Sequence, residues 1–148
     1  MAVVLIKEIV AMSMRIVIID GQGGGVGKAL VEKICMKCRS TDIVAVGTNS
    51  MATANMLKGG KIVGATGENA VVINAGRADV IVGPIGIIIA NAMLGEITPK
   101  MAEAVTSSQA RIMLIPMDRC GIHVVGVQEK KISEYIDEAV EEIIKIEE

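Results

Sequence analysis

Short apolar runs alternate along this chain with longer segments in which apolar residues recur every three or four positions. The first pattern is typical of buried strands, and the second is typical of helices with one buried face. The apolar runs predict strands at Arg15–Ile19, Ile43–Val46, Lys61–Val63, Asp79–Val82, Arg111–Ile115 and His123–Val127. Helices are predicted at Val26–Arg39, Asn49–Lys58, Thr66–Ala75, Ile85–Leu94, Thr98–Ser107 and from Ser133 onward. This alternation predicts a three-layer, Rossmann-like α/β fold, with a mostly parallel sheet of about five or six strands and helices on both faces.

Polar residues that can cap helices mark several of these helix starts. Asn49, Thr66 and Ser133 can each accept a hydrogen bond from a backbone N–H group in the first turn. Thr98 can do the same beside Pro99, whose ring suits the first helical position. We therefore expect helices to begin at these four positions.

Two segments can be read in more than one way. The length of Ile85–Leu94 favours a helix while its β-branched isoleucines favour a strand, and we expect a helix. His123–Val127 follows the preceding strand after about seven residues, which is too short for a parallel crossover. It should therefore pair antiparallel or lie at an edge of the sheet.

The first residues of the chain differ in pattern from the rest. Residues 1–13 form an apolar extension that can be helical or loose, and the first predicted strand follows Met14 directly. No linker or repeat interrupts residues 14–148, so we expect one Rossmann-like domain there. The extension lacks the basic start and small-residue cleavage site of a signal peptide, which predicts a cytoplasmic protein.

Composition narrows the range of partners. The 15 basic residues are balanced by 17 acidic ones, and the single aromatic residue is Tyr135, so nucleic acid is not an expected partner. No apolar run reaches the roughly 18 residues of a membrane-spanning helix, so no membrane is expected. Half of the residues are hydrophobic, which predicts a homo-oligomer that hides part of this surface.

A glycine-rich loop between the first strand and the first domain helix is the strongest functional signal. Glycines let a backbone turn with positive φ and approach a ligand closely, and the N–H groups at a helix start attract anions, phosphates above all. The loop therefore predicts a phosphate-binding site, and its expected contacts are Gly21, Gln22, Gly23, Gly24, Gly25, Val26 and Gly27.

The spacing of these glycines fits one nucleotide-binding template better than the others. Gly21, Gly25 and Gly27 match the G-x-x-x-G-x-G pattern of short-chain dehydrogenases. The G-x-G-x-x-G pattern fails, because Val26 stands where its third glycine belongs. The P-loop pattern also fails, because Ala29 replaces the hydroxyl residue that would hold Mg²⁺.

Two further positions bear on the cofactor. Deviant Walker ATPases carry a signature lysine at the position of Gly23, so ATP hydrolysis is not favoured. An NAD site wants an acidic residue after the second strand, where this chain has Thr48, Asn49 and Ser50. Small polar residues there can take a 2′-phosphate, so the expected cofactor is NADP or another nucleotide, with its identity open.

Other candidates lie where the remaining strands end, since ligands of such sheets bind beyond the carboxyl ends of the strands. Expected ligand contacts are Thr66, Glu68, Asn69, Gly83 and Arg119. For several of them an ordinary helix-capping or first-turn role is an equal alternative. Glu96 is the best candidate general base, although an ordinary exposed carboxylate is the more common role for such a residue. Cys120 is the thiol most expected in the site.

The Cys35-x-x-Cys38 pair has the spacing of a redox motif, but it falls near the end of a helix. Redox pairs use a helix start, where the dipole stabilises the thiolate. We therefore expect buried, inert cysteines. A zinc site would need Cys120 and His123 to approach the pair, which the spacing does not indicate, so no metal is expected.

Several longer motifs together resemble one family of proteins. They are M-R-I-V-I-I-D-G-Q-G-G-G-V-G-K-A-L, G-T-N-S, G-A-T-G-E-N, A-D-V-I-V-G-P-I-G, L-G-E-I-T-P-K-M-A-E-A and I-P-M-D-R-C. The chain from Met14 to about Val140 resembles an uncharacterised bacterial family, a domain of unknown function found mainly in anaerobic Firmicutes and their relatives. The resemblance implies a compact Rossmann-like protein and supplies no activity.

Three hypotheses of function follow from these residues. The leading one is the binding of a nucleotide or NADP-type dinucleotide by Gly21–Gly27 and Thr48–Ser50. The second is an enzyme for a phosphorylated or carboxylated small metabolite that uses Glu96, Arg119 or Cys120. The third is a non-catalytic nucleotide-sensing or structural oligomeric module. Whether Glu96 and Cys120 face the cleft of the glycine loop separates the second hypothesis from the others.

Overall fold

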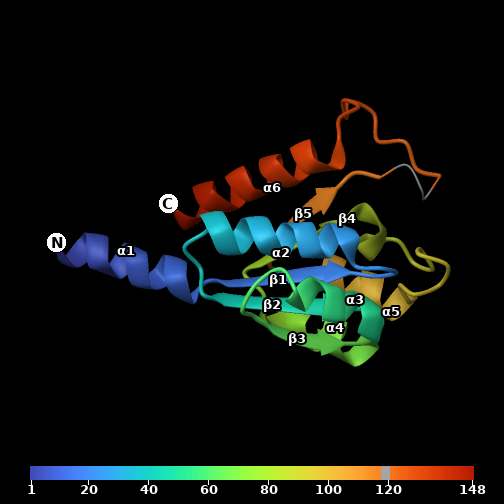
Figure 1. The fold of residues 1–148 in the computed structure, drawn as a ribbon, viewed down its shortest axis with the longest axis horizontal. Coiled ribbons are helices and arrows are strands. Elements are labelled where there is room, and N and C mark those ends of the chain that lie inside the picture. The colour runs from blue at the N-terminus through green and yellow to red at the C-terminus, as the bar shows by residue number, and fades with distance from the viewer. Residues whose placement is uncertain (118–120) are drawn as a thin grey trace.

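The computed structural model of this chain describes residues 1–117 and 121–148, and its centre is one parallel sheet (Figure 1). The strands are β1 (Arg15–Asp20), β2 (Asp42–Gly47), β3 (Val63–Thr66), β4 (Val80–Pro84) and β5 (Arg111–Ile115). They lie in the order β3-β2-β1-β4-β5, and every neighbouring pair is parallel. The central strand β1 is almost wholly apolar because helices cover it on both faces.

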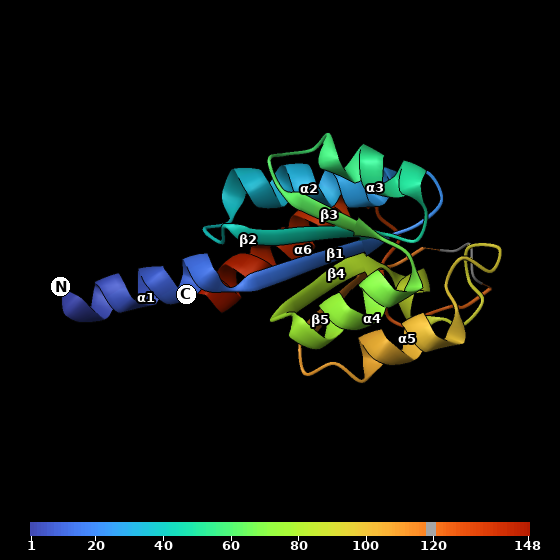
Figure 2. The same cartoon turned by 90° about the horizontal axis from the view of Figure 1, so that it is seen from below.

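Helices cover both faces of this sheet (Figure 2). The helices of the described chain are α1 (Ala2–Ser13), α2 (Gly25–Lys37), α3 (Ser50–Leu57), α4 (Glu68–Arg77), the 3-10 turn η1 (Ile85–Ile88), α5 (Pro99–Thr106) and α6 (Ile132–Glu147). Helices α2, α3 and α6 pack on one face, and α4 and α5 pack on the other. Alternate side chains of β1 serve the two cores, Ile16 and Ile18 on one side and Val17 and Ile19 on the other. The three-layer, Rossmann-like α/β architecture expected from the sequence is confirmed.

Helix α1 stands away from the rest of the chain (Figure 1). Most of its apolar side chains are exposed, and only Ala11 is buried. Its last turns are tied to the start of β2 by an ion pair between Glu8 and Arg39 and by a bond from the Thr41 N–H group to the Met12 carbonyl. The extension is thus helical and largely without cover. Among the described residues, every helix is too short or too polar to cross a bilayer.

The strand expected at His123–Val127 does not form, and residues 121–131 run irregularly to the start of α6. Gly126 has a φ of 92°, and the Val127 N–H group bonds to the Val124 carbonyl, so the chain turns where a strand would have to continue. The described chain therefore has a sheet of five strands that ends at β5.

The helix expected at Ile85–Leu94 was also wrong beyond its first turn. Only η1 is helical, and a looped segment follows in which Asn91, Met93 and Leu94 all have positive φ. The Asn91 N–H group bonds to the Ile97 carbonyl at 2.7 Å, which closes this loop. Further along this loop, Glu96 bonds to Gln22, Thr48 and Asn49, which are contacts distant in sequence that a local preference for a helix does not record.

Of the four predicted helix caps, two are confirmed and two are wrong. The Asn49 side chain accepts a bond from the Ala52 N–H group at 2.8 Å, and Thr98 accepts one from Met101 at 3.2 Å, so both caps are confirmed. Thr66 instead ends β3, and Gly67, with a φ of 102°, begins α4. Ser133 lies inside α6, which begins one residue earlier.

Candidate functional site

Asp20, the last residue of β1, links the two ends of the glycine-rich loop by hydrogen bonds. Its Oδ1 atom accepts a bond from the Gly21 N–H group at 2.8 Å, and its Oδ2 atom accepts one from Gly27 at 2.7 Å. The side chain is only 5% exposed. Burial raises the pKa of this carboxyl group, with a further contribution from Glu96, while the two backbone bonds oppose the increase. Asp20 was not singled out in the sequence, although a charged residue that ends an apolar strand is a usable signal.

The glycines of the loop are not equally required by the fold. Gly24 has a φ of 72°, and a Cβ atom there would lie 2.7 Å from the Ala52 carbonyl oxygen. A Cβ atom on Gly21 would lie 2.6 Å from the Thr48 hydroxyl oxygen. At Gly23 and Gly25, by contrast, φ is ordinary and no atom of the described residues lies within 4 Å of an added Cβ. The space in front of these two glycines is open.

Backbone donors face this open space. Within the described parts of the chain, the N–H groups of Gly23, Gly25 and Val26 have no acceptor. Gly25 and Val26 form the first turn of α2, where the helix dipole adds partial positive charge. The loop therefore offers donors that suit an anion.

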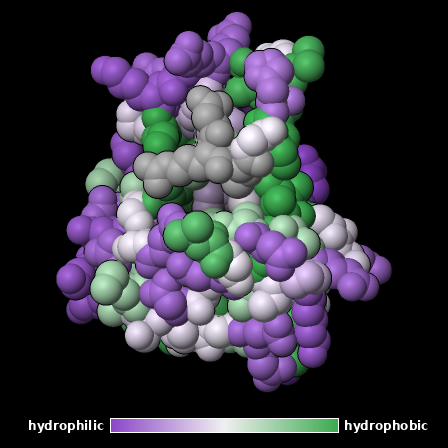
Figure 3. All heavy atoms as spheres, turned by 90° about the vertical axis from the view of Figure 1, so that its right-hand side faces the viewer, coloured by the Kyte–Doolittle hydropathy of each residue, from purple (hydrophilic) through white to green (hydrophobic). Residues whose placement is uncertain are grey.

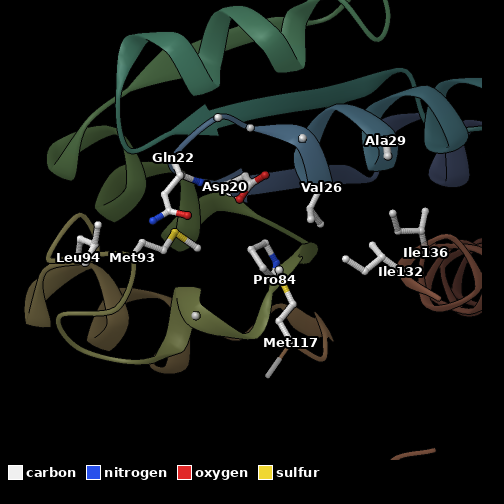
Figure 4. Close-up of a pocket in the computed structure, with 15 residues that line it drawn as sticks. Asp20, Gln22, Val26, Ala29, Pro84, Met93, Leu94, Met117, Ile132 and Ile136 are labelled. Atoms are coloured by element: carbon white, nitrogen blue, oxygen red, sulfur yellow. Dashed lines mark hydrogen bonds between the residues drawn. The ribbon is translucent and has the colours of Figure 1, made fainter. Parts of the chain in front are cut away.

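A cavity of about 650 Å³ opens beside the loop (Figure 4). One wall is the loop itself, and the other comes from the end of β4, the segment after η1 and the start of α6. The described side chains that line it are Asp20, Gln22, Val26, Ala29, Pro84, Met93, Leu94, Met117, Ile132 and Ile136. None of them is basic, and most are apolar. The carboxyl edge of the sheet, seen in Figure 3, accordingly carries apolar side chains near its centre and hydrophilic ones around its rim.

The structure brings Glu96, on the segment after η1, into contact with the same loop, although Glu96 does not line the cavity. Its Oε1 atom accepts bonds from the Gln22 N–H group at 2.8 Å, the Thr48 hydroxyl at 2.6 Å and the Asn49 side-chain amide at 2.7 Å. Partial burial alone would raise the pKa of Glu96, but these three bonds outweigh it and lower the pKa. The carboxylate is therefore ionised at neutral pH.

Two asparagines of the α3 region hold the loop in place. The side-chain amide of Asn49 donates to the Gln22 carbonyl, and that of Asn55 donates to the Gly23 carbonyl, each at 2.9 Å. Asn55 was missed in the sequence, since an asparagine within a helix carries no sign of a partner 32 positions away. Together these bonds tie the loop to its β2 side.

The remaining predicted contacts lie outside the cavity or outside the described residues. Ser50, Thr66, Glu68 and Asn69 are exposed near the ends of β2 and β3, and none of them lines the cavity. The Thr66 hydroxyl bonds to that of Thr53 at 2.7 Å. Gly83 is buried, and an added Cβ there would overlap the Ile19 carbonyl of β1, so the sheet needs this glycine. The predictions for Arg119 and Cys120 fall on residues that the structure does not describe.

The cysteine pair differs in part from expectation. Cys35 is exposed and Cys38 is half-buried, so the expected burial of both was wrong, because the two residues lie at the solvated end of α2. Burial, with the nearby Glu147 carboxylate, raises the pKa of Cys38 to about 12, so its thiol stays protonated at neutral pH. Among the described residues, no three His, Cys, Asp or Glu side chains gather as metal ligands would.

The fold and this site define a class of protein. The chain is a Rossmann-like α/β protein whose glycine-rich loop follows the central strand and borders a cavity at the carboxyl edge of the sheet. It belongs to the family described as Domain of unknown function (DUF3842), whose model matches residues 15–148, nearly the whole chain. The resemblance seen in the sequence is thus confirmed. No match was found among curated proteins or among solved structures.

Proposed function

We propose that this protein binds a small phosphate-bearing ligand, a nucleotide or dinucleotide, in the cavity beside the glycine-rich loop. The observation that carries the proposal is the open space at Gly23 and Gly25 in front of backbone N–H groups that have no acceptor among the described residues. Neither backbone conformation nor packing against described residues requires glycine at these two positions. A ligand group that approaches the backbone does require it, because a side chain would occupy its place.

The chemistry of the cavity suits such a ligand. A phosphate would accept bonds from the N–H groups of Gly23, Gly25 and Val26 at the positive end of α2. Rossmann-type sites hold a pyrophosphate largely through backbone donors, so the lack of a basic side chain among the described lining residues is no obstacle. The apolar side chains of Ile132 and Ile136 would cover a less polar part of the ligand, and the volume is that of a small-molecule site.

Glu96 supports a binding role better than a catalytic one. A general base works best with a pKa near the operating pH, and the pKa of Glu96 is lowered instead. One of its oxygens already accepts three hydrogen bonds. We therefore assign Glu96 to the architecture of the site, not to proton transfer.

Ligand-dependent thermal stability tests this proposal. The purified chain is heated alone and with NADH, NADPH, ATP or ADP with Mg²⁺, and sugar phosphates. A ligand at about 100 times its Kd adds about 2.7 kcal/mol to the free energy of unfolding. We expect at least one nucleotide to raise Tm and Gly25→Asp to abolish the shift, because its carboxylate would stand before the free N–H groups.

Gly76→Asp is the matched control for this variant. Gly76 lies in α4, away from the cavity, and an added Cβ there also meets no described atom. It adds the same charge and should leave the ligand-induced shift unchanged. If no nucleotide raises Tm, or if Gly25→Asp binds as the wild type does, the proposal is wrong.

We also propose that the chain forms a homo-oligomer through α1. Val3, Leu5, Ile6 and Ile9 are between 57% and 68% exposed, and a free helix of 12 residues is marginal in water unless it packs against something. Light scattering should give a mass above 15.5 kDa for the wild type and 15.5 kDa for Leu5→Lys/Ile9→Lys. Met36→Lys, at an exposed apolar site on α2, is the control, and a monomeric wild type would refute the proposal.

A further inference from the structure

Many nucleotide-binding α/β proteins hold the ribose hydroxyls with an acidic residue at the end of their second strand. In this chain β2 ends at Gly47, and Thr48 and Asn49 follow, so the acid is missing from that place in the sequence. The ends of β1 and β2 lie side by side, with Asp20 paired to Gly47. The structure fills the missing position from elsewhere, because Glu96 bonds to both Thr48 and Asn49.

The bonds to Glu96 leave part of its carboxylate free. All three donors converge on Oε1, and no described residue donates to Oε2. Glu96 itself does not line the cavity, but its half-exposed side chain bonds to the backbone of Gln22, which lies with Met93 and Leu94 at one end of the cavity (Figure 4). An ionised carboxylate can only accept hydrogen bonds. A ligand group that meets Oε2 must therefore donate one.

The backbone that carries Glu96 is held in a costly conformation. Met93 and Leu94 have φ values of 58° and 56°, a region that costs a residue with a side chain roughly 1–2 kcal/mol. The absence of a side chain at Gly21 lets this segment approach, since an added Cβ would lie 3.1 Å from Glu96 Oε1. Strain of this kind persists where the surrounding structure imposes a position, often at a functional site.

We infer that Glu96 is a specificity-determining residue that selects ligands with a free ribose diol and rejects ligands with a 2′-phosphate. The inference rests on the proposed nucleotide site and deepens it. The diol hydroxyls would donate to Oε2, whereas a phosphate there would bring two anions together in a partly buried place. This assignment is the opposite of the preference for NADP expected from Thr48–Ser50 alone.

The test uses two ligands that differ only at the 2′ position. The Kd values of NADH and NADPH are measured by calorimetry for the wild-type chain, Glu96→Gln and Glu103→Gln. We expect the wild type to bind NADH at least about tenfold more tightly than NADPH, since like charges at an interface are costly. Glu96→Gln should bring the ratio close to one, mainly through tighter binding of NADPH. Glu103→Gln removes the same charge from an exposed site on α5 and should keep the wild-type ratio.

The outcomes separate this inference from the function on which it rests. If the wild type binds both ligands equally, or prefers NADPH, the role of Glu96 is wrong while the phosphate site stands. An unchanged ratio in Glu96→Gln overturns the inference in the same way. If neither ligand binds, the inference falls, and the thermal-stability series with ATP, ADP and sugar phosphates decides whether the phosphate site falls with it.

Discussion

The two sides of the glycine-rich loop are built in opposite ways. Toward β2 and α3, the side-chain amides of Asn49 and Asn55 donate to carbonyl groups of the loop, and Glu96 accepts a bond from its Gln22 N–H group. Toward β4 and α6, it borders an open cavity with apolar walls, and its N–H groups there have no described acceptor (Figure 4). One side therefore fixes the shape of the loop, and the other leaves its donors available. The glycines divide in the same way, since Gly21 and Gly24 serve the fold while Gly23 and Gly25 leave space.

The largest effect should follow from a side chain at a glycine that the fold requires. Gly24→Ala should lower the free energy of unfolding by about 3 kcal/mol, because it adds left-handed strain to an overlap with the Ala52 backbone. Urea denaturation measures this loss. Gly23→Ala, one residue away, should change stability by no more than about 1 kcal/mol, in the stabilising direction. Equal losses in the two variants would contradict the division of the glycines.

Replacement of the buried carboxyl group of Asp20 should have the next largest effect on stability. Asp20→Asn should lower the free energy of unfolding by about 2 kcal/mol at pH 4, because either the Gly21 or the Gly27 N–H group then faces an amide donor. The pKa of Asp20 is raised above its ordinary 3.8, so its stabilising contribution is complete below that value and declines as pH rises through the raised pKa. Urea denaturation should therefore show a smaller difference at pH 7 than at pH 4. A difference that grows with pH would contradict this sign.

Replacement of the half-exposed carboxylate of Glu96 should show the reverse pH dependence. Glu96→Gln should lower the free energy of unfolding by about 1 kcal/mol at pH 7, because hydrogen bonds to a charged acceptor are stronger than bonds to an amide. The pKa of Glu96 is lowered below its ordinary 4.5, so its contribution is present above that value and is lost as pH falls through the lowered pKa. In the same denaturation series, the difference in unfolding free energy from the wild type should shrink toward high pH for Asp20→Asn and toward low pH for Glu96→Gln.

The smallest effect on stability should come from the amide that holds Gly23. Asn55→Ala loses one hydrogen bond of about 1 kcal/mol, but alanine is the better helix former by about 0.5 kcal/mol, so the net change should stay near 0.5 kcal/mol. The Kd of a nucleotide should nevertheless rise, because the Gly23 carbonyl is then free to move. Unchanged affinity would show that the polar side of the loop does not control the open side.

Local patterns identified the elements whose causes are local. The buried strands, the glycine-rich turn after β1 and the caps at Asn49 and Thr98 all follow from residues within a few positions of one another. The segment at Ile85–Leu94 and the stretch at His123–Val127 could not be predicted in this way. Positive φ values at Asn91, Met93 and Leu94 in the first segment and at Gly126 in the second turn the chain, and hydrophobic periodicity does not record them.

By itself, the sequence determined the class of fold and the place of the glycine-rich loop, because alternating apolar runs and a strand–glycine–helix junction are short-range properties. Only the tertiary structure decided which groups meet at that loop. Glu96 lies 74 positions from Gln22, and Asn55 lies 32 positions from Gly23, yet both bond to the loop. Parallel strands bring their carboxyl ends to one edge whatever their separation along the chain, so the partners of the loop come from connections that no local pattern joins.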